Sequence, residues 1–275
     1  MKPGLYFDIS FEDYVKIDAV NNSTLKILST QSPAHCKEYI DNGRHDTASL
    51  SFGRAADTYI LEPTLFAKQY VVGPDLNRNT KVWKEYKASV PEDVEILKQA
   101  EMDDIISIYN IMSKSHGMRL LSGGKSQVVC IWIDEKTGLL CKARFDYLNE
   151  QIPMITDLKT TKDANPESFA KDIFKYRYYM QAAFYVDGFI AVTQSKYDCC
   201  FAFFAVEKTA PFVNSAFELG CKSILAGQMA YRKALDLYAK CKADNNWPMY
   251  ANEINMIEMP GWALEIAGVG PGNML

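Results

Sequence analysis

The stretch QVVCIWIDEKTGLLCKARFDYLNEQIPMITDLKT, residues 127–160, decides the fold of this chain. Residues 127–134 and 139–148 are rich in β-branched and aromatic side chains, and DEKTG between them is typical of a turn. These two segments therefore predict a β-hairpin. Residues 153–160 predict a third strand that follows the hairpin closely enough to pair with it directly.

Downstream, the pattern predicts a helix that begins at Asn165-Pro166 and ends near Gly188, because proline is favoured in the first turn of a helix. Residues 197–206 predict a fourth strand, and a long helix is predicted over 211–242. This order favours an α/β fold, in which a mixed, mainly antiparallel central sheet is flanked by helices.

The part of the chain before the hairpin is predicted to be mainly helical. Short helices are expected over 22–28 and after Ser32-Pro33, a longer one over 48–62 that stops at Pro63, and helical periodicity runs over 83–122 after a loop at 73–81. We therefore expect a single domain over 1–275, with a helical part at 1–122, a core at 123–245 and a C-terminal extension at 246–275.

Composition limits the class of protein. The 275 residues are 48% hydrophobic with a net charge of −4, which excludes a largely disordered chain and a histone-like binder but leaves room for a local basic groove. The seven cysteines include no CxxC pair, so we expect reduced thiols and no Fe–S cluster. Neither a leader nor an apolar run of about 18 residues is present, which predicts a cytoplasmic protein without a membrane partner.

Charged side chains gather on the predicted strands. Alternation places Lys142, Arg144 and Asp146 on one face of residues 139–148, while Asp157 and Lys159 share a face of the next strand. Burial of an unpaired carboxylate costs several kcal/mol, so such acids are usually paired or bound to a metal. Asp146 and Asp157 together suit Mg²⁺, and Lys159 would orient or deprotonate a water beside it. The alternative is a surface salt bridge of Asp157 with Lys159 or Arg144.

A polar stripe follows on the predicted helix. Arg177, Gln181 and Tyr185 recur every four residues on a helix that is otherwise mostly apolar. The stripe is consistent with a row of side chains that lines a site, and equally with a solvated helix face.

Taken together, Arg144-Phe-Asp146, Asp157-Leu-Lys159 and Gln181-x-x-x-Tyr185 resemble the PD-(D/E)XK nuclease superfamily. The closest resemblance is to its exodeoxyribonuclease VIII (RecE-type) branch, found in phages and prophages. It extends over most of the chain through shorter matches: the segments at 22–28, 32–35, 53–63, 78–81, 131–146 and 247–250. The resemblance implies a restriction-endonuclease-like core.

The resemblance also implies an activity. Such an enzyme is a Mg²⁺-dependent exonuclease, with Mn²⁺ as a substitute, that degrades double-stranded DNA from its ends in the 5′-to-3′ direction during homologous recombination. It would leave a 3′ single strand for an annealing protein, and it would act as a ring-shaped homo-oligomer whose lining alone is basic. Carried over by position, Asp146, Asp157 and the Leu158 carbonyl would bind metal, and Lys159 would be catalytic. Gln181 and Tyr185 would hold the scissile phosphate and the geometry of the site.

Two positions depart from the RecE-type pattern. Asp57 stands where the family helix usually carries a histidine, and it can still bind Mg²⁺ through oxygen, so we include it among the metal ligands. Gln127 stands where the hairpin strand usually begins with a glutamate, and a glutamine supplies no charge. The two changes predict altered metal preference or reduced activity.

Five cations are candidates for DNA contact. Lys142 and Arg144 flank the predicted metal site, Arg177 lies one turn before Gln181, and Arg78 and Lys81 lie in a polar loop where a solvated charge cluster is an equal alternative. Two other functions remain open at this point. One is a structure-specific endonuclease of the same fold, and the other is a catalytically weak DNA-binding recombination protein.

Overall fold

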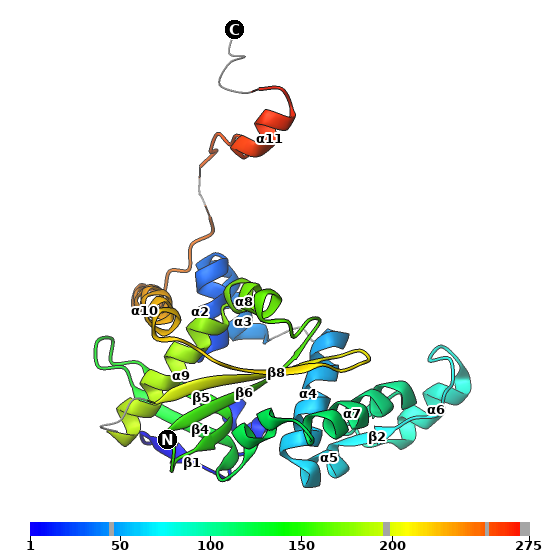
Figure 1. Cartoon of the computed structure of the whole chain (residues 1–275). Helices are drawn as coiled ribbons and strands as arrows, with labels where there is room; N and C mark the ends of the chain where they lie inside the picture. Colours follow the sequence, from blue (N-terminus) through cyan, green and yellow to red (C-terminus); the bar gives the residue numbers. More distant parts are fainter. Residues whose placement is uncertain (44–46, 195–198, 251–252, 270–275) are drawn as a thin grey trace.

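A computed structural model describes residues 1–43, 47–194, 199–250 and 253–269. Its centre is a six-stranded sheet in the order β1-β4-β5-β6-β7-β8 (Figure 1). Neighbouring strands are antiparallel except for β6 and β7, which are parallel. The predicted mixed, mainly antiparallel sheet is therefore confirmed. The strands are β1 Gly4–Tyr6, β4 Lys125–Ile133, β5 Leu140–Asn149, β6 Met154–Thr161, β7 Cys200–Glu207 and β8 Asn214–Glu218.

Helices make up most of the rest of the described chain, together with a small parallel pair formed by β2 and β3. Before the hairpin these elements are α1 Phe11–Lys16, α2 Asn22–Thr30, α3 Pro33–Asn42, α4 Ala48–Leu61, α5 Pro63–Gln69, β2 Tyr70–Val72, α6 Lys81–Ser89, β3 Glu95–Leu97, α7 Gln99–Met112 and the 3₁₀ helix η1 His116–Leu121. After it come α8 Pro166–Lys175, α9 Tyr178–Thr193, α10 Cys221–Asp244 and α11 Gly261–Ile266.

The sheet is covered on both faces. One face carries the largest apolar cluster, which includes Phe145 and Phe203 of the sheet and Phe184 of α9 and extends to the neighbouring helices α2 and α10 (Figure 1). On the other face Leu158 and Phe204 pack against α7 and α4. Polar residues that project from β5 and β6 therefore point into helix-covered space, where an unpaired charge is costly.

Several predicted elements are corrected. The single helix over residues 166–188 is two helices, because Arg177 adopts a left-handed backbone with φ 59° between α8 and α9. The first part of the helix predicted over 211–242 is strand β8, which pairs with β7. The prediction that 48–62 stops at Pro63 is right, but Pro63 also opens α5 as its first residue.

The helical periodicity over 83–122 also proved to be several elements. It contains α6, strand β3, α7 and η1, and the break after α6 falls at Val90-Pro91, since the residue before a proline is driven into extended backbone. Strands β1 and β2 and helix α1 gave no signal in the sequence, because each has six residues or fewer.

All seven cysteines lie in the described residues and are free thiols, and five of them are buried. None of the helices in the described part of the chain has the length and apolar character needed to cross a bilayer.

Candidate active site

The site begins where β5 and β6 separate. The two strands pair from Asn149 opposite Met154 to Tyr147 opposite Thr156. One step further, the backbone N–H of Leu158 donates to Oδ2 of Asp146 at 2.9 Å. A side-chain carboxylate thus replaces a backbone carbonyl as the partner of β6, and the strand fork is held open around Asp146.

Asp157 and Lys159 lie on the same face of β6, as the strand alternation predicts. Oδ1 of the buried Asp157 accepts a hydrogen bond of 2.6 Å from Nε2 of Gln181 on α9. The ammonium of Lys159 forms an ion pair with the other carboxylate oxygen of Asp157. The structure therefore joins three residues from the predicted catalytic set in one chain of polar contacts.

Asp57 reaches the same region from α4. Its Oδ1 atom is buried and has no hydrogen-bond partner among the described residues. Burial, followed by the negative charge of Asp146, raises the pKa of Asp57 well above its ordinary value, and Lys159 offsets this only in part. Burial and then the charge of Asp157 raise the pKa of Asp146 to about 7. Without a further cation, these shifts favour the protonated forms of Asp57 and Asp146, because Lys159 does not balance three ionised carboxylates.

This donor set fits a hard divalent cation in its chemistry. It offers oxygen atoms alone, its acids lack the positive charge needed to ionise all three, and Oδ1 of Asp57 has no hydrogen-bond partner among the described residues. The side chains are not gathered around a common point: within the described ranges no group of three or more His, Cys, Asp or Glu side chains stands ready to hold a metal. One of the three carboxylates, that of Asp157, already forms an ion pair with Lys159.

Tyr178, the first residue of α9, is a site residue that sequence reasoning missed. Its ring centroid lies 4.9 Å from Nζ of Lys159, within the range of a cation–π contact. Burial alone lowers the pKa of Lys159, but the negative charge of Asp157 and contributions from Tyr178 and Asp146 outweigh it, so the net shift is upward. Lys159 is therefore an ammonium at neutral pH. The signal for Tyr178 was its position beside the predicted stripe, one turn before Gln181.

The sequence matches one known protein family. The model of a family described as a PDDEXK-like domain of unknown function (DUF3799) matches residues 21–260. The chain belongs to this family. The resemblance to the PD-(D/E)XK superfamily is thereby confirmed, and the family supports a nuclease.

Solved structures agree with the fold of this PDDEXK-like domain. A candidate exonuclease from Eubacterium rectale is 13% identical, with a TM-score of 0.66, and the match covers 95% of this chain and 98% of that one. A second structure, SSO0001, is 12% identical over 78% of this chain and 85% of its own, but its TM-score of 0.30 is too low to indicate a shared fold. Among curated proteins, no relative matches the sequence.

Tyr185 packs inside the PDDEXK-like domain rather than at its surface. Its ring centroid lies 5.2 Å from that of Phe145. Burial raises the pKa of Tyr185 well above its ordinary value, and the charges of Asp157 and Asp146 contribute to the same shift. Tyr185 thus lies near Asp157 and Asp146, packed against Phe145.

The cations predicted to contact DNA differ in their distance from the carboxylates and in their partners. Arg144 forms an ion pair with Glu62 at 3.3 Å, while its Nε atom is buried without a hydrogen-bond partner among the described residues. Lys142 is only 3% exposed, and its ammonium donates to the backbone carbonyls of Tyr14, Val15 and Ile17 at 2.7–3.1 Å. This geometry speaks against a DNA contact for Lys142, which instead fixes the end of α1 to β5.

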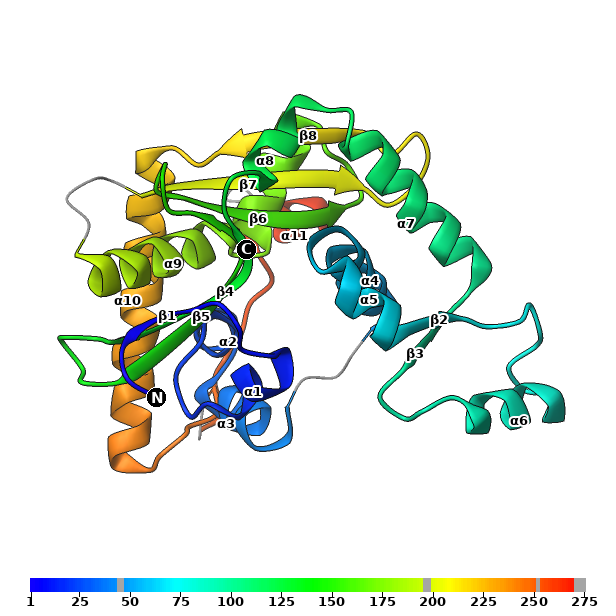
Figure 2. The ribbon, with the colours of Figure 1, turned by 90° about the horizontal axis from the view of Figure 1, so that it is seen from below.

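Arg78 and Lys81 lie in the segment between β2 and β3 that contains α6, and this segment extends away from α9 and α10 (Figure 2). The guanidinium of Arg78 lies 5.1 Å from the ring centroid of Trp83, and Lys81 pairs with Glu85 at 3.7 Å on the surface. The structure does not bring these two cations next to the carboxylates. Arg177, by contrast, directly precedes Tyr178 in the chain.

Gln127 occupies a strained position in β4. Its neighbours Ser126 and Val128 pair with Tyr147 and Phe145, so Gln127 is level with Asp146 across the hairpin. Its φ of 56° lies in the left-handed region, which costs a residue with a side chain about 1–3 kcal/mol and persists only where the surroundings impose it. The departure from the RecE-type pattern therefore lies directly beside the site.

Proposed function

We propose that this PDDEXK-like domain is a Mg²⁺-dependent exodeoxyribonuclease that degrades linear double-stranded DNA from its ends, in the 5′-to-3′ direction. The observation that carries the proposal is the strand fork. There, Lys159 pairs with the buried Asp157. Burial, together with the negative charge of neighbouring carboxylates, raises the pKa values of Asp57 and Asp146. Among titratable groups, those with strongly shifted pKa values in a buried cluster are candidates for catalysis.

The residues that would hold the metal are Asp57, Asp146 and Asp157, with the carbonyl of Leu158. A bound Mg²⁺ would supply charge neutralisation at the phosphate and a lowered pKa for a bound water, and Mn²⁺ would substitute for it. The raised pKa values of Asp57 and Asp146 support this assignment, because a bound cation would stabilise the ionised carboxylates.

The side chains of the protein have separate tasks in the reaction. The ammonium of Lys159, held by Asp157 and the ring of Tyr178, donates hydrogen bonds to a phosphate oxygen and offsets the charge that develops there. Because its pKa is raised, Lys159 acts as a donor and not as a base. Gln181 fixes the orientation of Asp157. The Leu158 N–H does the same for Asp146.

The wider biological role rests on the RecE-type resemblance. It supports a place in phage-type recombination, an annealing protein that takes over the 3′ single strand, and a homo-oligomeric ring around the substrate. A ring also reconciles an acidic chain with DNA binding, because only its lining needs positive charge.

The deciding experiment is the digestion of linear duplex DNA labelled separately at its 5′ and 3′ ends, with Mg²⁺, Mn²⁺ or EDTA. We expect metal-dependent release of the 5′ label, no cleavage of closed circles, and complete loss in Asp157→Ala. The matched control is Asp75→Ala, which removes an exposed aspartate outside the site.

Other outcomes would favour the rival functions. Cleavage of closed circles identifies a structure-specific endonuclease. A folded protein that binds DNA but forms no product with either metal is a catalytically weak recombination protein, and Gln127→Glu is then the variant to test for restored activity.

A further inference from the structure

We propose that the aromatic and basic residues at the joint of α8 and α9, Phe174 to Tyr179, form a stacking platform for unpaired nucleotides of a DNA strand beside the catalytic centre. This inference rests on the proposed nuclease function and adds a binding site for single-stranded DNA to it. The segment reads Phe-Lys-Tyr-Arg-Tyr-Tyr, an alternation of rings and cations.

The joint turns aromatic rings outward. Phe174 is 66% exposed and Tyr176 is 39% exposed, at the point where the left-handed Arg177 ends one helix and starts the next. On α8 the aromatic Phe169 is buried in the core, whereas Phe174, five residues further along, lies on a different side of the helix and is exposed. Two large rings held at the surface are suited to stack on bases.

Cations surround both exposed rings. Nζ of Lys175 and Nζ of Lys26 lie 5.1 Å and 5.8 Å from the ring centroid of Tyr176. The guanidinium of Arg177 lies 5.2 Å from the centroid of Phe174, and its Nε is buried without a hydrogen-bond partner among the described residues. A cation thus lies over each exposed ring, and its charged group can contact a phosphate of a strand whose base stacks on the open part of that ring.

Local charge favours a polyanion. Residues 171–179 carry three cations, Lys171, Lys175 and Arg177, against the single acid Asp172, in a chain whose net charge is −4. Aromatic rings between cations are the composition of sites that bind single-stranded nucleic acid without sequence preference. An apolar protein partner would not use this row of charges, because the cores of protein interfaces are depleted in lysine.

The platform is continuous with the catalytic centre. The ring centroids of Tyr176 and Tyr178 are 5.6 Å apart, and the Tyr178 ring lies 4.9 Å from Nζ of Lys159. Tyr178 thus contacts both the exposed ring and the proposed catalytic lysine. A strand whose phosphate is held at Lys159 would place a neighbouring base over Tyr176.

The test is the binding of a fluorescein-labelled oligothymidine to the full chain in EDTA, followed by fluorescence anisotropy. We expect the double variant Phe174→Ala/Tyr176→Ala to bind at least about tenfold more weakly than the wild type, because each stacked base contributes strongly to affinity. The control Tyr250→Ala, which removes a ring exposed to 73%, should bind like the wild type. Phe174→Trp/Tyr176→Trp should restore or exceed wild-type affinity.

Two results would overturn the platform: absence of oligothymidine binding by the wild type, or equal affinity of the double alanine variant. If equal affinity is accompanied by a changed oligomeric state in sedimentation, the patch is a protein interface. Thermal unfolding checks that the variants are folded, and Phe174→Leu/Tyr176→Leu serves in place of an alanine variant that is not. Because binding is measured without metal, failure of duplex digestion by the wild type would overturn the nuclease function alone.

Discussion

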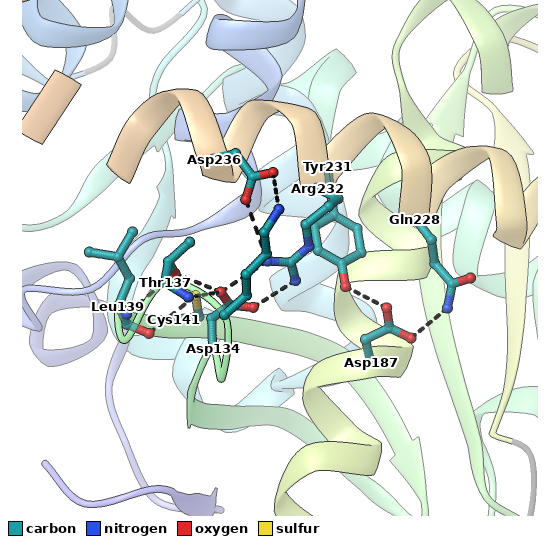
Figure 3. A network of polar contacts seen from close by, with 10 residues as sticks. Asp134, Thr137, Leu139, Cys141, Asp187, Gln228, Tyr231, Arg232 and Asp236 are labelled. Carbon is teal, nitrogen blue, oxygen red and sulfur yellow. Dashed lines mark hydrogen bonds and ion pairs between the residues drawn. The ribbon is translucent and has the colours of Figure 1, made fainter. Parts of the chain in front are cut away.

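Two polar clusters in this protein contain buried aspartate side chains, but only the first gives its aspartate a full set of hydrogen-bond partners. In the first, Asp134 at the end of β4 accepts from both guanidinium nitrogens of Arg232 on α10, at 2.6 and 2.9 Å, and from the hydroxyl of Thr137 at 2.6 Å (Figure 3). Burial alone would raise the pKa of Asp134, but these hydrogen bonds bring it below its ordinary value. The cluster ties the β4–β5 turn to α10.

In the second cluster, at the fork of β5 and β6, the acids have too few partners. Asp57 and Asp146 have raised pKa values, and an oxygen of Asp57 lacks any partner in the described part of the chain. A fully partnered acid stabilises a fold, whereas an under-partnered one costs stability and is retained for another reason. The difference between the clusters distinguishes a structural site from a candidate functional site without reference to any relative.

The largest expected effect comes from the cation of the fork. Lys159→Ala should lower the rate of duplex digestion at least about 100-fold, because it removes a preorganised donor aimed at the phosphate. The matched control is Lys136→Ala, which removes a lysine that pairs with Asp236 at 2.6 Å near the first cluster. Its digestion rate should equal that of the wild type. A full rate in Lys159→Ala would make the fork a structural feature.

The next effect concerns stability in the first cluster. Arg232→Ala leaves the buried Asp134 without its bidentate partner, and the free energy of unfolding should fall by about 2–3 kcal/mol. Urea unfolding measures it, and digestion per folded molecule should not change. An unchanged urea midpoint would show that water replaces the hydrogen bonds that Asp134 loses with Arg232.

A smaller change in stability, of opposite sign, is expected at the fork. The pKa of Asp146 is raised to about 7 when the protein folds, so its contribution to stability is full at low pH and is lost as the pH rises through 7. In EDTA, Asp146→Asn should therefore be about 2 kcal/mol more stable than the wild type at pH 8 and similar at pH 4.

The comparison variant for this pH dependence is Asp134→Asn. The pKa of Asp134 is lowered, so its contribution is present above the unfolded pKa and is lost as the pH falls. Asp134→Asn should be less stable than the wild type at pH 8, with the gap closing in acid. Thermal unfolding at the two pH values decides it, and parallel behaviour of the two variants would contradict the distinction between the clusters.

The smallest effect is expected at Tyr178. Tyr178→Phe keeps a ring beside Lys159 and should retain the digestion rate, while Tyr178→Leu should lose about fivefold in kcat with little change in KM. Steady-state kinetics on labelled duplex separates the two parameters. Equal kcat in the two variants would reduce Tyr178 to a packing residue.

The strands that carry the site could be predicted from sequence because their signals are local. The hairpin, the third strand and the shared face of Asp157 and Lys159 all follow from side-chain alternation over a few residues. The joint at Arg177 could not be predicted, since Arg177 is not a residue type that marks a left-handed backbone and the apolar pattern continues across it. Strand β8 was missed because only its pairing with β7 distinguishes it from the helix that follows.

For individual site residues, sequence pattern was not enough, because their surroundings depend on tertiary packing. Alternation placed Lys142 on the same face as Arg144 and Asp146, but it carried no information that the end of α1 would cover Lys142 with three carbonyl groups. Tyr178 was missed for the same reason, because only folding brings the first turn of α9 over Lys159. Sequence pattern identifies the face of a strand, and packing decides which residues of that face remain available.

The hydrogen bond between Asp146 and the N–H of Leu158 ties the ancestry of this protein to its folding. Position 146 bonds to the backbone of the sheet as well as serving the proposed chemistry, whereas the ammonium of Lys159 contacts, among the described residues, only side chains of the same site, Asp157 and Tyr178. A descendant lineage released from selection for DNA cleavage would lose Lys159 first and keep aspartate or asparagine at position 146. Such a remnant would still mark where the two strands part, long after the reaction had disappeared.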